Sequence, residues 1–96
     1  MAAIDYAQQA LADLERIAEF LLATDPHAAA QTTDLVVGAI EVLRRHPLIG
    51  RPAEEGLHEL VISRGRSGYL ALYEYDPPTD AVTVLAIRHQ REVGYD

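Results

Sequence analysis

Residues 57–91, LHELVISRGRSGYLALYEYDPPTDAVTVLAIRHQR, decide the fold of this chain. They hold three apolar runs, at residues 57–63, 69–76 and 81–89. Two segments rich in glycine and proline separate the runs, RGRSG at 64–68 and DPPTD at 76–80. Apolar runs bounded by such turn residues are typical of consecutive antiparallel strands. The stretch therefore predicts a three-stranded antiparallel meander, and the rest of the chain must cover it.

The two faces of this meander differ in chemistry, because side chains along a strand alternate between faces. Strict alternation places six aliphatic residues on one face: Leu60, Ile62, Leu70, Leu72, Leu85 and Ile87. It places a more aromatic set on the other: Val61, Tyr69, Ala71, Tyr73, Tyr75, Val84 and Ala86. We expect the aliphatic face to receive the helices. The tyrosine face would then be partly exposed or covered by a partner.

The N-terminal half predicts a short strand at residues 2–6 followed by two helices. In the first helix apolar residues recur at helical spacing, at Ala7, Ala10, Leu11, Leu14, Ile17, Ala18, Leu21 and Leu22. The opposite, outer face is assigned Asp13, Glu15, Arg16 and Glu19. Asp25 and Pro26 then end this helix and begin a second one, which stops before Pro47. Arg44, Arg45 and His46 lie in its last turn, where positive charge complements the helix dipole.

Two helices joined by so short a link pack as an antiparallel hairpin. The whole chain, residues 1–96, is thus expected to form a single domain. Its fold class is α/β of the α+β type: an N-terminal strand, a helical hairpin and a three-stranded antiparallel meander. Residues 49–56 show neither helical nor strand periodicity and are expected to form a connecting loop.

Composition limits the functional classes. The net charge is −7, which opposes strong direct binding to nucleic acid. All eight basic residues are arginine, whose planar guanidinium suits carboxylate, phosphate or aromatic partners. The sequence has no run of 18 apolar residues, no basic N-terminal region and no cysteine. We therefore expect a cytoplasmic protein with no membrane association.

One cluster of side chains is a candidate functional site. In an antiparallel meander the first turn and the end of the third strand lie at the same end of the sheet. This brings together six residues: Arg64, Arg66, Arg88, His89, Arg91 and Tyr95. Arginines there could stabilise a phosphorane-like charge while His or Tyr moves a proton. Alternatively, they neutralise nearby acidic groups or dock an acidic partner. The four histidines share no ligand spacing, so no metal or other cofactor is expected.

The order of these elements and several short motifs resemble the RelE/ParE superfamily, the toxins of bacterial type II toxin–antitoxin modules, often labelled plasmid stabilisation proteins. The motifs are Leu43…His46-Pro47…Gly50-Arg51-Pro52, Leu57-x-Glu59-Leu60, Gly68-Tyr69…Leu72-Tyr73 and Leu85-Ala86-Ile87-x-His89-x-Arg91. The resemblance covers essentially the whole chain. It implies a cognate antitoxin that wraps over the toxin in a hetero-oligomer. The expected antitoxin contacts are Tyr69, Tyr73 and Tyr75 of the sheet and Leu14, Ile17 and Leu21 of the first helix.

The superfamily includes ribosome-dependent mRNA endonucleases, the RelE branch, and DNA gyrase poisons, the ParE branch. In the nuclease branch the second meander strand reads Gly-Tyr-Arg-Leu-Val-Tyr, with the arginine serving the scissile phosphate. Here Leu70 stands at that position. The resemblance therefore favours a ParE-like toxin that binds gyrase through the six-residue cluster without catalytic residues. The alternatives are a RelE-like mRNA endonuclease, or a non-toxic remnant that only binds antitoxin.

Overall fold

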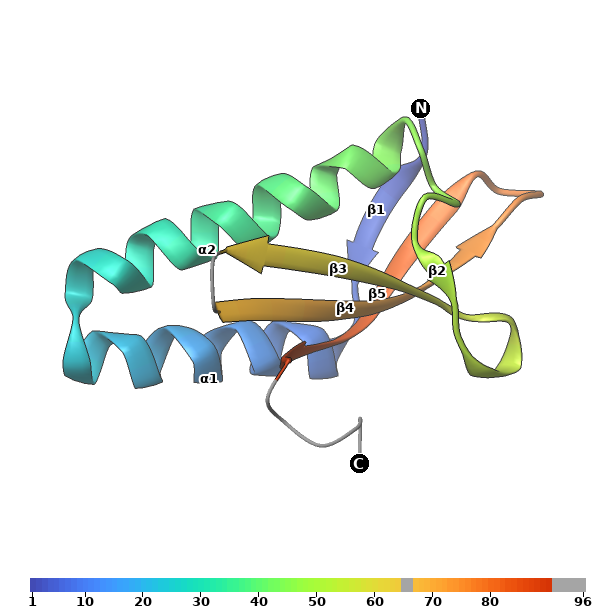
Figure 1. Ribbon diagram of the computed structural model, residues 1–96. Helices are drawn as coiled ribbons and strands as arrows, with labels where there is room; N and C mark the ends of the chain where they lie inside the picture. The colour runs from blue at the N-terminus through green and yellow to red at the C-terminus, as the bar shows by residue number, and fades with distance from the viewer. Residues whose placement is uncertain (65–66, 91–96) are drawn as a thin grey trace.

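The computed structural model of the chain consists of a five-stranded sheet with two long helices (Figure 1). It describes residues 1–64 and 67–90, with the backbone alone at residues 63, 64 and 67. The elements in chain order are β1 (Ala3–Tyr6), α1 (Gln8–Thr24), α2 (Pro26–Glu41), the 3₁₀ turn η1 (Val42–Arg44), β2 (Arg51–Pro52), the 3₁₀ turn η2 (Glu54–Gly56), β3 (His58–Arg64), β4 (Ser67–Asp76) and β5 (Ala81–His89).

The predicted order of strand, helical hairpin and meander is confirmed. The strand order in the sheet is β1-β5-β4-β3-β2. Strands β3, β4 and β5 form the antiparallel meander, and β1 pairs parallel to β5 through Ala3–Tyr6. The short strand β2, within the expected loop, was not predicted, because two residues establish no periodicity. It pairs antiparallel with the start of β3.

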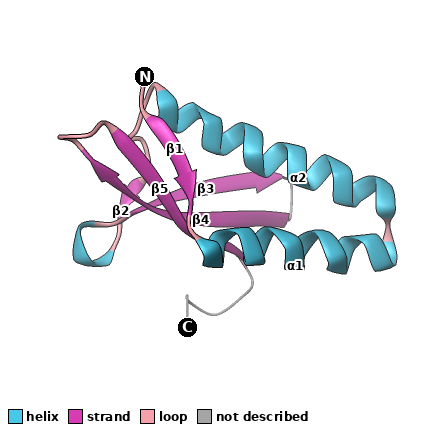
Figure 2. Cartoon of the chain, turned by 180° about the vertical axis from the view of Figure 1, so that it is seen from behind, coloured by secondary structure: helices cyan, strands magenta, loops and turns pink. Residues whose placement is uncertain are grey.

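The junction between the helices follows the predicted chemistry. The Asp25 side chain accepts a hydrogen bond from the Ala28 N–H at 3.2 Å, which caps α2, and Pro26 is the first residue of that helix. The two helices consequently turn back on each other and lie side by side (Figure 2).

The expected orientation of the sheet is wrong, because the tyrosine face packs against the helices. Tyr73 and Ala71 have no exposed surface, and Tyr69 is also buried. They share a core with Ala2, Ala10, Ile17, Val36, Ile40, Leu43, Ile62, Val82, Val84 and Ile87. In the opposite face, Val61 pairs with Leu70, and Leu72 pairs with Ala86.

Strand register explains this reversal. Ile62 of β3 pairs with Tyr69 of β4, so aliphatic and aromatic residues that were assigned to different faces share one. An irregularity in the β4–β5 pairing at Leu72 and Tyr73 then shifts the alternation along β5. As a result Val84 and Ile87, three residues apart, both lie in the core.

Within the part of the chain that the structure describes, no helix is long and apolar enough to cross a membrane.

Candidate functional site

The end of β3, the start of β4 and the end of β5 lie at one end of the sheet, as the sequence predicts. Tyr69 pairs with His89, and the Gln90 N–H donates to the Gly68 carbonyl at 2.9 Å. Of the six predicted cluster residues, Arg66, Arg91 and Tyr95 lie outside the described residues, and Arg64 is described by its backbone alone, at the end of β3. The side chains of Arg88 and His89 are the ones that the structure places.

Arg88 is held by a carboxylate from the first helix. Its guanidinium forms an ion pair with Asp13 of α1, and both side chains are largely buried, with exposed fractions of 14% and 3%. The same Asp13 oxygen accepts the Ile87 N–H at 3.0 Å. Strand β1 pairs with β5 only as far as Val84, so α1 supplies the acceptor where the neighbouring strand has ended. Asp13 therefore fastens α1 to the end of β5 that carries the candidate site.

The charge of Asp13 is stabilised despite its burial. Burial alone would raise the pKa of this carboxyl, but hydrogen bonds from Ile87, Gln9 and Arg88, with the positive charge of Arg88, together lower it below its ordinary value. The Gln9 amide donates at 3.0 Å, and an Arg16 guanidinium nitrogen lies 3.8 Å from the carboxylate.

The assignment of Asp13 to the outer face of the helix is wrong. It lies three residues after Ala10 and four before Ile17, both buried, so helical spacing places it at the margin of the apolar stripe. That spacing is the signal that could have identified it. The approach of Arg88, 75 positions later in the chain, depends on how α1 sits beside β5 and has no local sequence signal.

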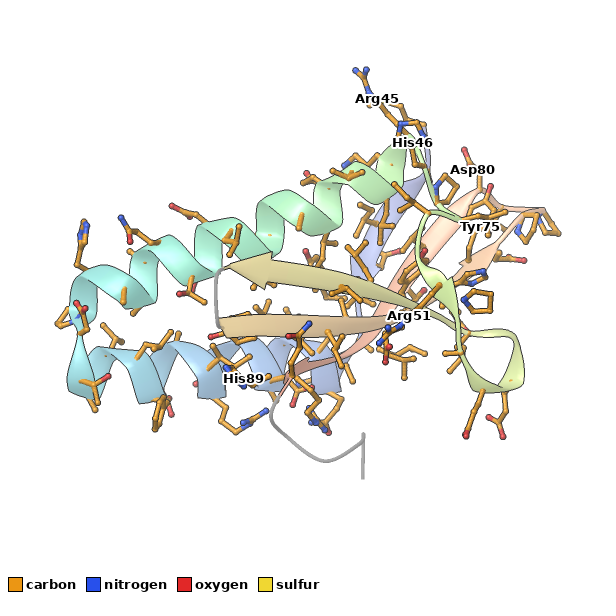
Figure 3. The ribbon with its side chains drawn as sticks, viewed as in Figure 1. Arg45, His46, Arg51, Tyr75, Asp80 and His89 are labelled. Atoms are coloured by element: carbon orange, nitrogen blue, oxygen red, sulfur yellow. The ribbon has the colours of Figure 1, made fainter. Side chains whose placement is uncertain are left out.

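His89 is positioned by the core. Its ring meets Tyr69 edge to face, with the ring centres 5.2 Å apart and an angle of 87° between their planes. Tyr69 is buried, so the imidazole lies against a fixed aromatic support. Figure 3 shows His89 where β5 approaches the end of the sheet.

The residues expected to contact an antitoxin lie in or against the core. Tyr69, Tyr73 and Ile17 are buried, and Leu14, Leu21 and Tyr75 are partly buried and packed against that core. Their role in antitoxin binding remains a prediction. For the three buried residues, contact with a partner would require the core to open.

Tyr73 and Tyr75 have different polar contacts. The Tyr73 hydroxyl accepts the Gly50 N–H at 2.9 Å, and burial raises the pKa of this phenol. The Tyr75 hydroxyl donates to Asp80 at 2.8 Å, and this hydrogen bond raises its pKa. Both hydroxyls are thus engaged within the fold.

A second surface, at the opposite end of the sheet, is formed by the loop that follows η1. Arg45 and His46 extend from the end of the helical hairpin, far from His89 (Figure 3). Beyond them Leu48 and Ile49 are more than half exposed. From the sequence alone, compensation of the helix dipole is a sufficient explanation for the positive residues here, and it gives no indication of the aliphatic pair. The sequence signal is the pair of consecutive aliphatic residues directly after Pro47, where the second helix is predicted to have ended.

Among the described residues, no three histidine or acidic side chains come close enough together to hold a metal ion.

Two comparisons at the level of sequence both match proteins described as toxins. The family described as ParE toxin of type II toxin–antitoxin system, parDE, matches residues 4–94. The chain is also similar to Toxin RelE3 of Caulobacter vibrioides, with 34% identity over 92 residues that cover 96% of this chain and 98% of the relative.

Solved structures support the same fold. A chromosomal ParDE system from P. aeruginosa contains a chain similar to this one with a TM-score of 0.77 at 22% identity, covering 91% of this chain and 94% of that one. The RelBE2 toxin–antitoxin complex of Mycobacterium tuberculosis contains another, with a TM-score of 0.61 at 24% identity, covering 93% and 98%.

Proposed function

This chain belongs to the ParE toxin family of type II toxin–antitoxin systems, and from that membership we propose that it arrests growth by binding DNA gyrase without chemistry of its own. A cognate antitoxin neutralises it in a hetero-oligomer. Target contact is assigned to the cluster of Arg64, Arg66, Arg88, His89, Arg91 and Tyr95.

The observation that carries this proposal is the environment of Leu70. In the nuclease pattern that the sequence resembles, an arginine for the scissile phosphate stands at this position. Leu70 pairs directly with Arg88 across β4 and β5, so the arginine nearest in register is Arg88. Its guanidinium is committed to the buried Asp13. A cation already paired inside the fold is a weaker stabiliser of a developing phosphate charge than an unpaired one.

The charge of the whole chain also favours gyrase binding over mRNA cleavage. A net charge of −7 repels RNA and the ribosome at long range. A protein target can be bound through a local cluster, because packing and short-range complementarity contribute most of the affinity there. The negative net charge therefore disfavours cleavage of mRNA on the ribosome more than it disfavours binding to gyrase.

An mRNA endonuclease is the second candidate, favoured by the similarity to Toxin RelE3 and to a chain of the RelBE2 complex. A chain that has lost toxicity and only binds antitoxin is the third. It would need the antitoxin surface but not the arginine cluster.

Growth experiments separate the three candidates. The chain is expressed alone in a bacterial host, while a DNA-damage reporter and the rate of translation are followed in one culture. Gyrase binding predicts that damage signalling rises before translation falls. An early collapse of translation with a silent reporter would favour the endonuclease. Unimpaired growth at a verified protein level would favour the remnant.

Purified components provide the direct test. Gyrase and supercoiled DNA are incubated with the chain, and trapped DNA cleavage complexes are quantified. Arg88→Ala and His89→Ala are expected to weaken the effect, and Asp34→Asn on the exposed surface of α2 is the control. Circular dichroism must show that each variant is folded. RNA cleavage by the same proteins is measured in parallel. If wild type cleaves RNA, Arg88→Ala does not, and none of the proteins traps gyrase cleavage complexes, the proposal is contradicted.

A further inference from the structure

The loop surface, defined as Arg45, His46, Pro47, Leu48 and Ile49, is held rigidly by the fold. The His46 N–H donates to the Val42 carbonyl at 3.0 Å, and the Ile49 N–H donates to the His46 carbonyl at 3.1 Å. The next residue, Gly50, is buried and anchored to the Tyr73 hydroxyl. The loop surface is thus fixed at both ends and closed internally by a turn.

This fixed loop exposes aliphatic side chains. Leu48 and Ile49 have exposed fractions of 59% and 57%, and Val42 in the adjoining 3₁₀ turn has 44%. His46, Pro47, Leu48 and Ile49 line an open hollow. Neighbouring exposed aliphatic residues on an ordered loop are typical of surfaces that a partner covers. The hollow gives one aliphatic side chain of a partner a place to bind.

A positively charged side chain, Arg45, directly precedes in sequence the residues that line the hollow. Arg44 pairs with Glu41, Arg51 with Glu59, and Arg16 and Arg88 with Asp13. Of the arginines whose side chains the structure describes, Arg45 is the one that forms no ion pair. It stands beside the exposed His46 and extends from the body of the protein (Figure 3). In a chain of net charge −7, this local positive charge selects a carboxylate from among possible partners.

We propose that the loop surface docks the antitoxin, through a segment that places a carboxylate on Arg45 and His46 and an adjacent aliphatic side chain in the hollow. This inference rests on the proposed function and assigns a surface to the neutralising partner. Arg88 and His89, the members of the target cluster whose side chains the structure places, lie at the other end of the sheet. Tyr69, Tyr73 and Ile17 are buried in the core, whereas the loop surface is exposed.

Isothermal titration calorimetry with the cognate antitoxin tests the proposal. Leu48→Ser and Arg45→Gln are each expected to weaken binding about tenfold or more. Val37→Ser is the apolar control, because Val37 of α2 is 38% exposed and lies outside the expected antitoxin contacts. Gln31→Glu on α2 is the charge control, since it changes net charge by the same amount as Arg45→Gln. Both controls are expected to bind within about twofold of wild type.

Three outcomes would overturn the inference. In the first, wild type binds the antitoxin and neither loop variant is weaker than its control. In the second, Leu48→Ser converts a wild-type dimer to a monomer with antitoxin affinity unchanged, which identifies a second copy of this chain as the occupant. In the third, the loop variants lose growth arrest in the absence of antitoxin, which assigns the surface to the target.

The proposed function is judged separately, by the growth and gyrase experiments, which do not use the loop variants. If wild type neither arrests growth nor binds the antitoxin, the proposed function and this inference both fail. If it does both, the comparison of loop variants with controls decides the inference. Retained growth arrest with weakened neutralisation in Leu48→Ser and Arg45→Gln is the expected result.

Discussion

At the scale of single residues, Asp13 is the side chain on which the candidate site most depends. Asp13→Asn removes the negative charge and leaves the Arg88 guanidinium without its buried partner. We expect the free energy of unfolding to fall by about 2–3 kcal/mol, as for loss of hydrogen bonds to a charged group. Urea denaturation measures this. Asp34→Asn makes the same charge change on an exposed site and should cost under about 0.5 kcal/mol.

The contribution of Asp13 should depend on pH. Its pKa in the folded protein is lower than the ordinary value of 3.8, so the unfolded chain binds its proton first as pH falls. The difference in unfolding free energy between wild type and Asp13→Asn is then full above that ordinary value. It is lost as pH falls further, through the folded pKa. Urea denaturation of both proteins at a series of pH values measures the difference. A pH-independent difference would contradict a charged Asp13.

Gly50 is a position where even one methyl group is too large. A Cβ there would lie 2.6 Å from the Tyr73 Oη, 2.8 Å from its Cε1 and 2.9 Å from the Glu59 carbonyl oxygen. Gly50→Ala should therefore destabilise the fold by about 1–3 kcal/mol through overpacking. Gly38→Ala is the matched control, because a Cβ at Gly38 in α2 would meet nothing within 4 Å. It is expected to stabilise the protein by about 0.5–1 kcal/mol. Equal effects in thermal unfolding would contradict this reasoning.

At the scale of elements, the helical hairpin depends on its junction. Asp25→Ala removes the acceptor for the Ala28 N–H and should cost about 1 kcal/mol, whereas Asp25→Ser retains a capping oxygen and should cost much less. Urea denaturation followed at a helical wavelength compares the two. A similar loss in both variants would show that the cap contributes little and that packing between the helices holds the junction.

The helices and the meander strands could be predicted from local sequence, but the face of the sheet that is buried could not. Helix α1 follows from the spacing of its apolar residues, and the start of α2 follows from Asp25 and Pro26. Such signals act over a few neighbouring residues. Which face of the sheet is buried depends instead on register between strands and on the irregularity at Leu72 and Tyr73. A shift of one residue reverses every later side chain.

The candidate site could likewise be predicted only in part. Topology was sufficient to bring the first turn of the meander and the end of β5 together, because strands one and three of a meander run parallel. The pairing of Arg88 with Asp13 was not predictable, since it joins a helix and a strand far apart in the chain. The loop surface was missed because Arg45 and His46 have a sufficient local explanation at the end of a helix.

At the scale of the whole molecule, a small core and an incompletely covered surface argue for a stabilising partner. A chain of this length buries only about 60–70% of its unfolded surface. The described residues leave Leu11, Phe20, Leu22, Leu48 and Ile49 half exposed or more. A protein that binds only the folded state stabilises it by mass action. Antitoxin should therefore raise the melting temperature of this chain.

Mass action sets the size of the rise in melting temperature. Free antitoxin at 100 times its Kd contributes about 2.7 kcal/mol. In a domain of this size each kcal/mol corresponds to about 4–8 °C, so the melting temperature should rise by about 10–20 °C. Leu48→Ser, with affinity tenfold weaker, should gain only about half as much at the same antitoxin concentration. Differential scanning fluorimetry across a series of antitoxin concentrations measures both shifts.

The melting temperature of Leu48→Ser without antitoxin is the internal control for this measurement. Leu48 is 59% exposed, so its replacement should leave the isolated chain within about 2 °C of wild type. A smaller shift with an unchanged starting temperature would then report on binding and not on folding. A melting temperature of wild type that does not depend on antitoxin concentration would mean that the partner does not bind the folded chain, because such binding must raise it.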